Sequence, residues 1–344
     1  MKSIPNVPYI AQLVGTRDLW EPLWGLKTRL TQAESCLLHS SALRRLQFIH
    51  HSGCSYINTQ HNSSRLQHTL GVFSLLAYIC PDWFELRAAA LLHDIGHSPF
   101  SHTLEQLTGF DHHKQTESLI CAPEVSEILS RYGLRSTEIL DIINGRIPSP
   151  LNNHANIVQL DHLDSWVRSG QVTGVLSVST QSLLSSLALQ EGFIATDPQT
   201  AELLLQLIIS EAHFHCSSVN IGPNTMLKSL VAKLIDHQVV TPETICLQTD
   251  AWLESVLMNC ELTSKDTKRL FYRPHEIMVT RDPEAAPSNA FIAELKKLYL
   301  SLPMIKGSMA TPSSLPSFHI IEKMTALLGT YYVYWDLGDE KSTK

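Results

Sequence analysis

The segment LLHDIGHSPFSH, residues 91–102, decides the predicted fold class and site of this chain. It ends an apolar run, WFELRAAALL, whose spacing predicts a helix, and Gly96 with the Ser-Pro pair after it predicts a break before the next helix. At this break, His93 and Asp94 offer an imidazole nitrogen and a carboxylate oxygen to one ion. A single His-Asp pair occurs by chance, so its meaning depends on the surrounding sequence.

Helical periodicity extends on both sides of this segment, from about residue 30 to residue 240. Apolar residues recur at three- and four-residue steps in SRLQHTLGVFSLLAYI, SHTLEQL, STEILDIING and TAELLLQLIISEAHFH, whereas alternating strand patterns are scarce. Beyond residue 240, AWLESVLMNC and FIAELKKLYL predict helices between Pro- and Ser-rich breaks, and TYYVYW predicts a short strand. The sequence therefore predicts an all-α fold, with a helical bundle at residues 1–240 and a smaller, mainly helical C-terminal subdomain at residues 241–344.

Composition narrows the class of protein. Hydrophobic residues make up 44% of the 344 residues, enough to bury a core, and 26 Lys and Arg against 33 Asp and Glu give a formal charge of -7. This balance argues against a basic surface for a nucleic-acid backbone, so no nucleic-acid partner is expected. No apolar run reaches the ~20 residues that span a bilayer, the first residues do not resemble a signal peptide, and the seven Cys form no CxxC pair. We therefore expect a cytoplasmic protein without a membrane partner.

Two other segments supply the remaining predicted metal ligands. His68 lies in a predicted helix one turn from Arg65, so a ligand and a cation lie on nearly the same face. Asp161 ends an apolar stretch, where an unpaired carboxylate would be costly to bury and a shared cation would remove that cost. Any one such His is more often a hydrogen-bonded core residue, but together with His93 and Asp94 these residues form a mixed nitrogen and oxygen shell. We predict one divalent ion (Fe, Mn, Zn, Co, Ni or Mg) with positions left for water and a phosphate.

Several of the 17 His residues follow the His-Asp pair closely. Imidazoles can donate to a phosphate or pass a proton to a leaving oxygen near neutral pH, so three of them are predicted to be catalytic: His97, His102 and His112. His113 fits a surface or packing position equally well. For Arg65, a phosphate contact is favoured over a helix salt bridge.

The order of these motifs resembles that of the HD superfamily. Between about residues 25 and 240, SALRRLQFIHHSG, SRLQHTLGV, ALLHDIGHSPFSHTLE, DHHKQTE and LDHLDSWVRSG follow one another as they do in the deoxynucleoside triphosphate triphosphohydrolases and the related sterile-alpha-motif/HD proteins. The resemblance implies an HD-domain helical bundle and a phosphate contact at Arg65. It also implies His102 as the general acid or the nucleophile's partner, and His112 at the α-phosphate. The metal ligands that it implies are the same four: His68, His93, Asp94 and Asp161.

Positions that read the sugar in those enzymes differ in this chain. A His-Ser-Gly sequence that begins at His51 replaces their Gln-Leu-Gly, and His162, Ser165 and Ser169 replace their Lys, Tyr and Asp. Loss of the bulky Tyr ring should leave room for a 2'-hydroxyl. HFHCSSVNIGPN also replaces a phosphate-contacting stretch rich in Arg and Tyr, which argues against strong triphosphate binding. The predicted substrate-binding residues are Arg65, His51, Asp164 and Arg168.

The residues and the resemblance together predict a metal-dependent phosphoric ester or anhydride hydrolase that acts on a nucleotide, first of all on a (deoxy)nucleoside triphosphate-type substrate. One alternative is an HD-type nucleotidase or phosphodiesterase that acts on another phosphorylated small molecule. Another, of a different class, is a nucleotide-binding sensor or interaction module with a vestigial site. The changed sugar-reading residues favour this last alternative, whereas the intact metal quartet disfavours it. Relatives of this kind often assemble, so a homo-oligomer stays open.

Overall fold

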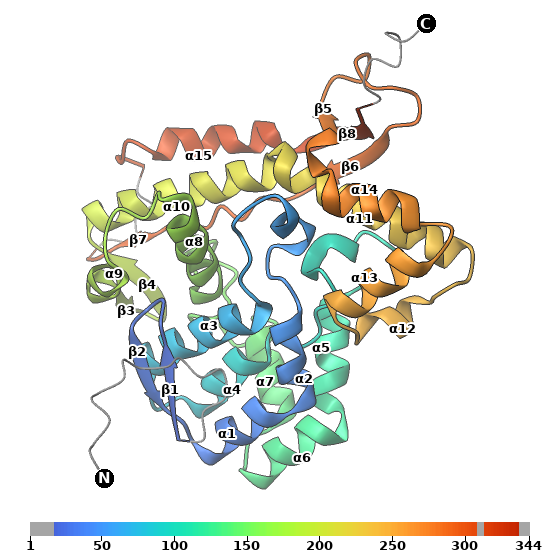
Figure 1. Cartoon of the computed structure of the whole chain (residues 1–344). Coiled ribbons are helices and arrows are strands. Elements are labelled where there is room, and N and C mark those ends of the chain that lie inside the picture. The colour runs from blue at the N-terminus through green and yellow to red at the C-terminus, as the bar shows by residue number, and fades with distance from the viewer. Residues whose placement is uncertain (1–16, 308–312, 337–344) are drawn as a thin grey trace, which may run out of the picture.

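The structure is a computed structural model that describes residues 17–307 and 313–336 (Figure 1). Helices account for 55% of it and strands for 12%, so the chain is mainly helical with several small sheets. The prediction of a mainly helical chain is therefore confirmed, but the prediction of an all-α fold is wrong, because small strands occur both before and after residue 240. Among the described residues, no helix combines the length and the apolar character needed to cross a bilayer.

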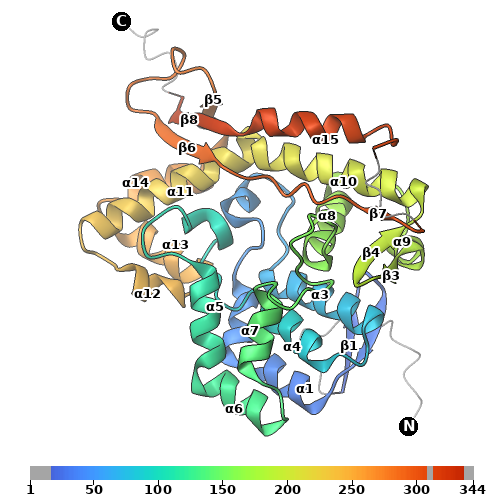
Figure 2. The same ribbon diagram turned by 180° about the vertical axis from the view of Figure 1, so that it is seen from behind.

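The bundle is built around α3 (Arg65–Ile79), which packs against α4 (Phe84–Leu92) and α8 (Leu160–Thr173). Seven further helices surround these three in the described part of residues 17–240, and α10 and α11 lie end to end along one side (Figures 1 and 2). They are α1 (Gln32–His39), α2 (Ser41–Arg45), α5 (His112–Cys121), α6 (Pro123–Arg131), α7 (Ser136–Ile143), α10 (Pro198–Cys216) and α11 (Ser218–Asp236). The short α9 (Thr180–Ser186) lies at the edge of this group.

Local sequence explains how α3 begins and how it meets α8. The Ser64 hydroxyl accepts a hydrogen bond from the backbone N–H of Gln67, and the Gln67 side chain accepts one from the backbone N–H of Ser64. This capping box satisfies two backbone donors that would otherwise lack partners. Further along α3, Gly71 allows α8 to approach closely, because a Cβ at this position would overlap the carboxylate of Asp164.

Three small sheets occur within the described residues. The first is the antiparallel hairpin of β1 (Asp18–Glu21) and β2 (Leu26–Arg29). The second has the order β3-β4-β7, with β3 (Ala188–Gln190) antiparallel and β7 (Met304–Ile305) parallel to β4 (Phe193–Thr196). The third is antiparallel in the order β5-β8-β6, formed by β5 (Ile277–Thr280), β8 (Gly329–Trp335) and β6 (Phe291–Leu295).

The part of the chain after residue 240 combines this third sheet with α12 (Pro242–Cys246), α13 (Asp250–Asn259), α14 (Ser264–Tyr272) and α15 (Phe318–Met324). The helix predicted in AWLESVLMNC is confirmed as α13, and the strand predicted in TYYVYW is confirmed as β8. The helix predicted in FIAELKKLYL is wrong, because its first five residues form β6. Pairing with β8, which is rich in Tyr and Val, overrides the helical spacing of this segment.

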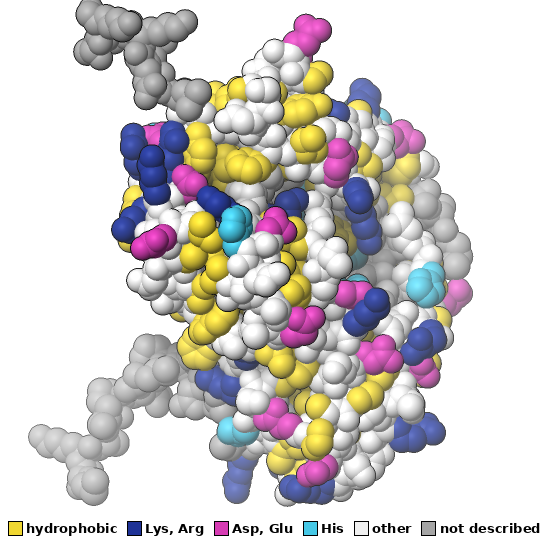
Figure 3. Space-filling view, turned by 90° about the vertical axis from the view of Figure 1, so that its right-hand side faces the viewer, with side chains coloured by type: hydrophobic (Ala, Val, Ile, Leu, Met, Phe, Trp, Pro, Cys, Tyr) yellow, Lys and Arg dark blue, Asp and Glu magenta, His cyan; other side chains and the backbone are white. Residues whose placement is uncertain are grey.

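Residues beyond 240 return to the bundle. β7 pairs with β4, and α15 packs along α10, as both ribbon views show (Figures 1 and 2). On the face drawn in Figure 3, which is the right-hand side of Figure 1, acidic and basic side chains are interspersed. The domain boundary at residues 240/241 stays a prediction. Because of these contacts, the last third of the chain helps to enclose the space between itself and α8.

Candidate metal centre and pocket

Four side chains from three separate segments converge at the centre of the bundle. His68 lies in the first turn of α3, His93 and Asp94 follow α4, and Asp161 lies in the first turn of α8. His68 Nε2 is 3.0 Å from Asp161 Oδ1 and 3.7 Å from Asp94 Oδ2. His93 Nε2 is 3.5 Å from Asp94 Oδ2 and 3.7 Å from Asp161 Oδ1. Ligands about 2.1 Å from one octahedral metal lie about 3 Å apart, so small movements would bring all four donors onto one ion.

The directions of the two imidazoles support this arrangement. The Nδ1–H of His93 donates to the carbonyl oxygen of Ala90 at 2.9 Å, which turns Nε2 toward the carboxylates. That nitrogen is buried and has no hydrogen-bond partner among the described residues. His68 Nδ1 donates to Asp164 Oδ2 at 2.9 Å, so its Nε2 faces Asp161. A buried ring nitrogen without a hydrogen-bond partner, placed beside two carboxylates, fits a site for a divalent cation.

Charge is tightly balanced in this group. Burial lowers the pKa of His93, but Asp94 and Asp161 outweigh burial and raise it to about 9. Burial raises the pKa of Asp94, but His93 and Arg65 outweigh it and hold this pKa well below its usual range. The carboxylates are therefore ionised, and protons on the imidazoles compensate them in the form without metal. A divalent ion would replace those protons as the positive partner.

Asp164 and Arg168, which were predicted to bind substrate, lie behind His68 and are not among the residues that line the pocket. Asp164 is fully buried and accepts hydrogen bonds from His68 Nδ1 and, at 2.8 Å, from the indole N–H of Trp24. Arg168 pairs with Asp164 at 3.0 Å and with Glu21 at 3.4 Å. Burial and the charge of Asp164 raise the pKa of Glu21 to about 7. These residues orient His68 rather than touch a ligand.

We expect the Asp164→Asn variant to bind Mn²⁺ ~10–100-fold more weakly than the wild type, because partners of this kind fix the orientation and basicity of a metal-binding His. An amide at this position can present its oxygen or its nitrogen to His68 Nδ1, so the ring orientation is no longer fixed. Isothermal titration calorimetry measures the difference. The Asp236→Asn variant, altered at the exposed end of α11, is the matched control. Unchanged affinity in Asp164→Asn would show that this carboxylate does not orient His68.

Arg65 and His51, which were predicted to bind substrate, both line the pocket. The Arg65 guanidinium donates to Asp94 Oδ2 at 2.9 Å, to Ser101 Oγ at 3.2 Å and to the carbonyl oxygen of His51 at 3.0 Å. The His51 ring stacks on His68 with 4.4 Å between centroids, and its Nε2 lies 3.3 Å from Ser165 Oγ. Their contact with a substrate stays a prediction.

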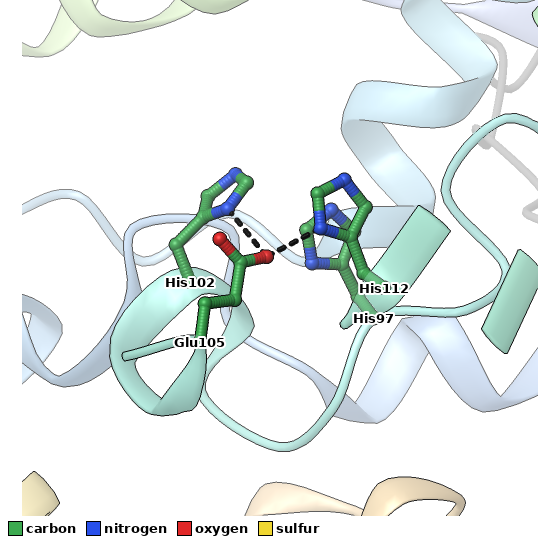
Figure 4. Close-up of side chains that lie close together, drawn as sticks. All are labelled: His97, His102, Glu105 and His112. Atoms are coloured by element: carbon green, nitrogen blue, oxygen red, sulfur yellow. Dashed lines mark ion pairs between the residues drawn. The ribbon is translucent and has the colours of Figure 1, made fainter. Parts of the chain in front are cut away.

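The three His residues predicted to be catalytic also meet in the pocket (Figure 4). His97 Nε2 lies 3.2 Å from Asp94 Oδ1, and its ring stacks on that of His112 with 4.2 Å between centroids. His102 faces both rings edge-on. Glu105, which the sequence reasoning missed, lies between His102 and His112. Its position three residues after His102 was the only available signal.

Backbone features hold this group in place. At Gly96, a Cβ would overlap the backbone at the start of α5, so glycine allows His112 to approach. Phe100 and Ser101 both adopt the left-handed conformation, with φ values of 57° and 54°, which is unfavourable for residues with side chains. Asp250 from α13 accepts a hydrogen bond from the Phe100 N–H at 2.6 Å and stabilises this turn. A residue from the C-terminal third thus shapes the site, and no sequence motif marked it.

The pocket has a cavity volume of about 700 Å³, within the usual size range of small-molecule sites. One end of the pocket is lined by His93, Asp94 and Asp161. His68, the fourth residue of the predicted metal quartet, lies behind the wall of the pocket. The lining of the pocket also includes Lys228 from α11, and Lys297 and Tyr299 from the segment after β6. The sequence reasoning missed these residues, because single cations and aromatics in the last third of the chain formed no recognisable spacing.

Comparison with known proteins agrees with this geometry. The HD-domain family matches residues 65–164, the interval that contains all four converging side chains. The uncharacterized protein YdhJ of Bacillus subtilis is 25% identical over 229 residues, which cover 64% of this chain and 69% of YdhJ. A deoxyguanosinetriphosphate triphosphohydrolase-like protein of Brucella ovis is 32% identical over 117 residues, but these cover only 29% of this chain and 28% of that protein.

The fold is also shared with a solved structure. The crystal structure of a phosphohydrolase from Bacteroides thetaiotaomicron aligns with a TM-score of 0.71 over 93% of this chain and 99% of that chain, at 15% identity. At such low identity the likeness concerns the fold alone. The sequence match at residues 65–164 and the convergence of His68, His93, Asp94 and Asp161 agree with it. Residues 65–164 therefore match the HD-domain family, and the four converging side chains all lie within this match.

Proposed function

We propose that this chain is a metal-dependent phosphohydrolase that acts on a phosphorylated small molecule, and first of all on a nucleotide. The observation that carries the proposal is the unpartnered Nε2 of His93, which faces Asp94 and Asp161 at the end of a pocket that also contains Arg65. His68, His93, Asp94 and Asp161 would hold one divalent ion. When bound, the ion supplies a nucleophile at neutral pH and polarises a phosphoryl oxygen.

Arg65 is placed to bind the phosphoryl group. A guanidinium has five N–H donors, and three hydrogen bonds to Asp94, Ser101 and His51 leave some of them for a ligand. Because Arg65 is buried and held at three points, its fork would be fixed before a phosphate arrives. It would bind and orient the oxygens next to the ion.

His102 is the best-placed proton donor for the leaving oxygen. Its side chain is about half exposed to the pocket, whereas His97 is fully buried and in contact with Asp94. Glu105 lies beside His102 Nδ1 and would stabilise a protonated ring. His112 would contact a neighbouring phosphate oxygen.

Three other residues that line the pocket support a nucleotide as the substrate. Lys228 and Lys297 add two cations, so the pocket is less poor in positive charge than the sequence indicated. Tyr299 lies edge-on to His162 with 4.9 Å between centroids and offers an apolar surface to a base or sugar. Near the sugar position implied by the resemblance, Ser165 lines the pocket and leaves space that a Tyr ring would fill. We therefore propose that ribose and deoxyribose are both accepted.

A substrate panel tests this function. Purified protein with Mn²⁺ is incubated with ribo- and deoxynucleoside mono-, di- and triphosphates, cyclic nucleotides and sugar phosphates, and the products are separated by anion exchange. We expect turnover of at least one nucleotide, and the released fragment identifies the bond that breaks. Triphosphate release would place the chain with relatives such as the Brucella ovis protein, whereas inorganic phosphate or a monophosphate from a cyclic substrate would indicate a nucleotidase or phosphodiesterase. Tight nucleotide binding with no product would instead support a sensor.

A further inference from the structure

Asp250, the first residue of α13, is a buried carboxylate that joins two distant segments of the chain. Its Oδ2 accepts a hydrogen bond from the backbone N–H of His50 at 2.7 Å and lies 2.8 Å from His50 Nδ1. Its Oδ1 accepts a hydrogen bond from the backbone N–H of Phe100 at 2.6 Å. One side chain from the C-terminal third therefore connects the segment before α3 with the segment after α4.

A role confined to α13 does not account for these contacts. An acidic residue in the first turn of a helix stabilises the helix dipole from an exposed position, whereas Asp250 is buried. The helix already has a cap, because the side chain of Thr249 accepts a hydrogen bond from the Trp252 N–H. His50 in turn stacks flat on Tyr56, with 3.7 Å between ring centroids, which holds its ring beside Asp250. The carboxylate thus serves the segments that it joins.

The same two segments hold the guanidinium of Arg65. The carbonyl oxygen of His50 accepts a hydrogen bond from Ser101 Oγ at 2.6 Å, and Ser101 Oγ accepts one from Arg65 Nε at 3.2 Å. The carbonyl oxygen of His51, the next residue, accepts one from Arg65 Nη2 at 3.0 Å. Asp250 fixes His50 directly and Ser101 through the preceding residue, so it controls two of the three positions at which Arg65 is held.

The segment at residues 100–101 needs such an external hold. Phe100 and Ser101 both have positive φ values, and residues with side chains keep this conformation only where their surroundings enforce it. Phe100 is buried, so its N–H would be costly to leave without a partner. Without the carboxylate of Asp250 this turn would relax, and the Ser101 hydroxyl would move away from Arg65.

A second tie makes α13 a firm support for these contacts. Arg45 Nη1 donates to the carbonyl oxygen of Gln248 at 3.0 Å, two residues before α13 begins. Arg45 Nη2 donates to the carbonyl oxygens of Ile95 at 2.8 Å and of His97 at 2.7 Å. The start of α13 is therefore attached to the loop after α4 by a guanidinium as well as by the carboxylate of Asp250.

We propose that Asp250 is a positioning residue for Arg65, which fixes the two segments whose oxygen atoms orient the guanidinium. Asp250 does not line the pocket, so it acts through His50, Phe100 and Ser101. The C-terminal third is then part of the unit that binds phosphate. The inference rests on the proposed function in one respect, the role of Arg65 as the phosphate contact.

Asp250→Asn in the full chain tests this inference, because the amide keeps the volume of the side chain but has only one acceptor oxygen. We expect inorganic phosphate to bind ~10-fold more weakly to the Mn²⁺-loaded variant, and kcat with the best substrate of the panel to fall ~10–100-fold, since a shift of ~1 Å has effects of this size. Mn²⁺ affinity should stay nearly unchanged, because the charge of Arg65 remains beside Asp94. Calorimetry and steady-state kinetics measure these values, and Asp236→Asn again serves as the matched control.

The double variant Arg65→Ala/Asp250→Asn separates positioning from general damage. If Asp250 acts through Arg65, the double variant has the phosphate affinity and the kcat of Arg65→Ala alone. Losses that multiply in the double variant would overturn the proposal. So would unchanged phosphate affinity in a folded Asp250→Asn protein, or an equal loss of Mn²⁺ and phosphate binding.

Ser101→Ala gives the same test if Asp250→Asn does not fold. This change removes the hydroxyl between His50 and Arg65 and leaves Asp250 in place. We expect weaker phosphate binding, nearly unchanged Mn²⁺ affinity and no further loss when Arg65 is already Ala, and unchanged phosphate binding would contradict the proposal. Failure of the proposed function would look different, because phosphate binding would respond to these variants as expected while no substrate of the panel is turned over.

Discussion

His93→Ala is expected to lose the ion at the quartet and to reduce turnover by at least ~10³-fold, because the ion supplies both the nucleophile and the charge that stabilises the reacting phosphate. His93 is the most informative of the four ligands. Its Nε2 has no other partner in the described structure, and its Nδ1 makes one hydrogen bond to Ala90. Removal of Asp94 would instead leave the buried Arg65 without its carboxylate and endanger folding.

Turnover is measured with the best substrate of the panel, and the metal at the quartet is located by anomalous diffraction. Thermal unfolding checks that the variant is folded. The matched control is His213→Ala, which removes an exposed imidazole from the outer side of α10 and should change neither value. A His93→Ala protein that lacks the quartet ion and still turns over would contradict the proposed mechanism.

The convergence of His68, His93, Asp94 and Asp161 could be predicted because each residue has a distinctive local setting. His93 and Asp94 end an apolar helix, His68 lies one turn after Arg65, and Asp161 follows an apolar stretch. A polar residue in such a place needs a partner, and a shared ion provides one for all four. Burial of His68, His93 and Asp94 in the structure follows from the same pattern.

Some features of the site could not be predicted, because they depend on contacts between distant parts of the chain that sequence spacing does not report. Asp164 and Arg168, which were predicted to bind substrate, lie one and two turns after Asp161 on α8. The structure turns them toward α3, where Gly71 leaves room for the Asp164 carboxylate. Glu105 and Asp250 were missed because each is a single acidic residue whose partners come from elsewhere in the chain.

The C-terminal third also contains a contact that local sequence spacing does not report. FIAELKKLYL has helical spacing, yet pairing with β8 makes its first part a strand and leaves Lys297 and Tyr299 in an extended segment against the pocket. Such pairing joins residues about 40 positions apart, as Phe291 opposite Val333 illustrates. A local pattern carries no information about that contact, so this wall of the pocket could not be predicted.

Arg65→Ala is expected to lower kcat by ~10²–10³-fold, the usual effect of removing one preorganised donor to a developing negative charge. Arg65 has two roles here, since it neutralises Asp94 and faces the pocket. Arg65→Lys separates them. A Lys keeps a positive charge near Asp94 but lacks the planar fork that binds two phosphate oxygens, so we expect Mn²⁺ affinity to recover while kcat stays low.

The measurements are kcat, KM and the Kd for Mn²⁺ in both variants, with thermal unfolding to detect damage from the unpaired Asp94. Arg146→Ala is the matched control, because Arg146 forms an exposed pair with Asp141 on the surface and such pairs contribute ~0–1 kcal/mol. Full recovery of kcat in Arg65→Lys would show that Arg65 acts only as the countercharge of Asp94. The phosphate contact would then have to come from another cation of the pocket, and Lys228 and Lys297 are the side chains in position to provide it.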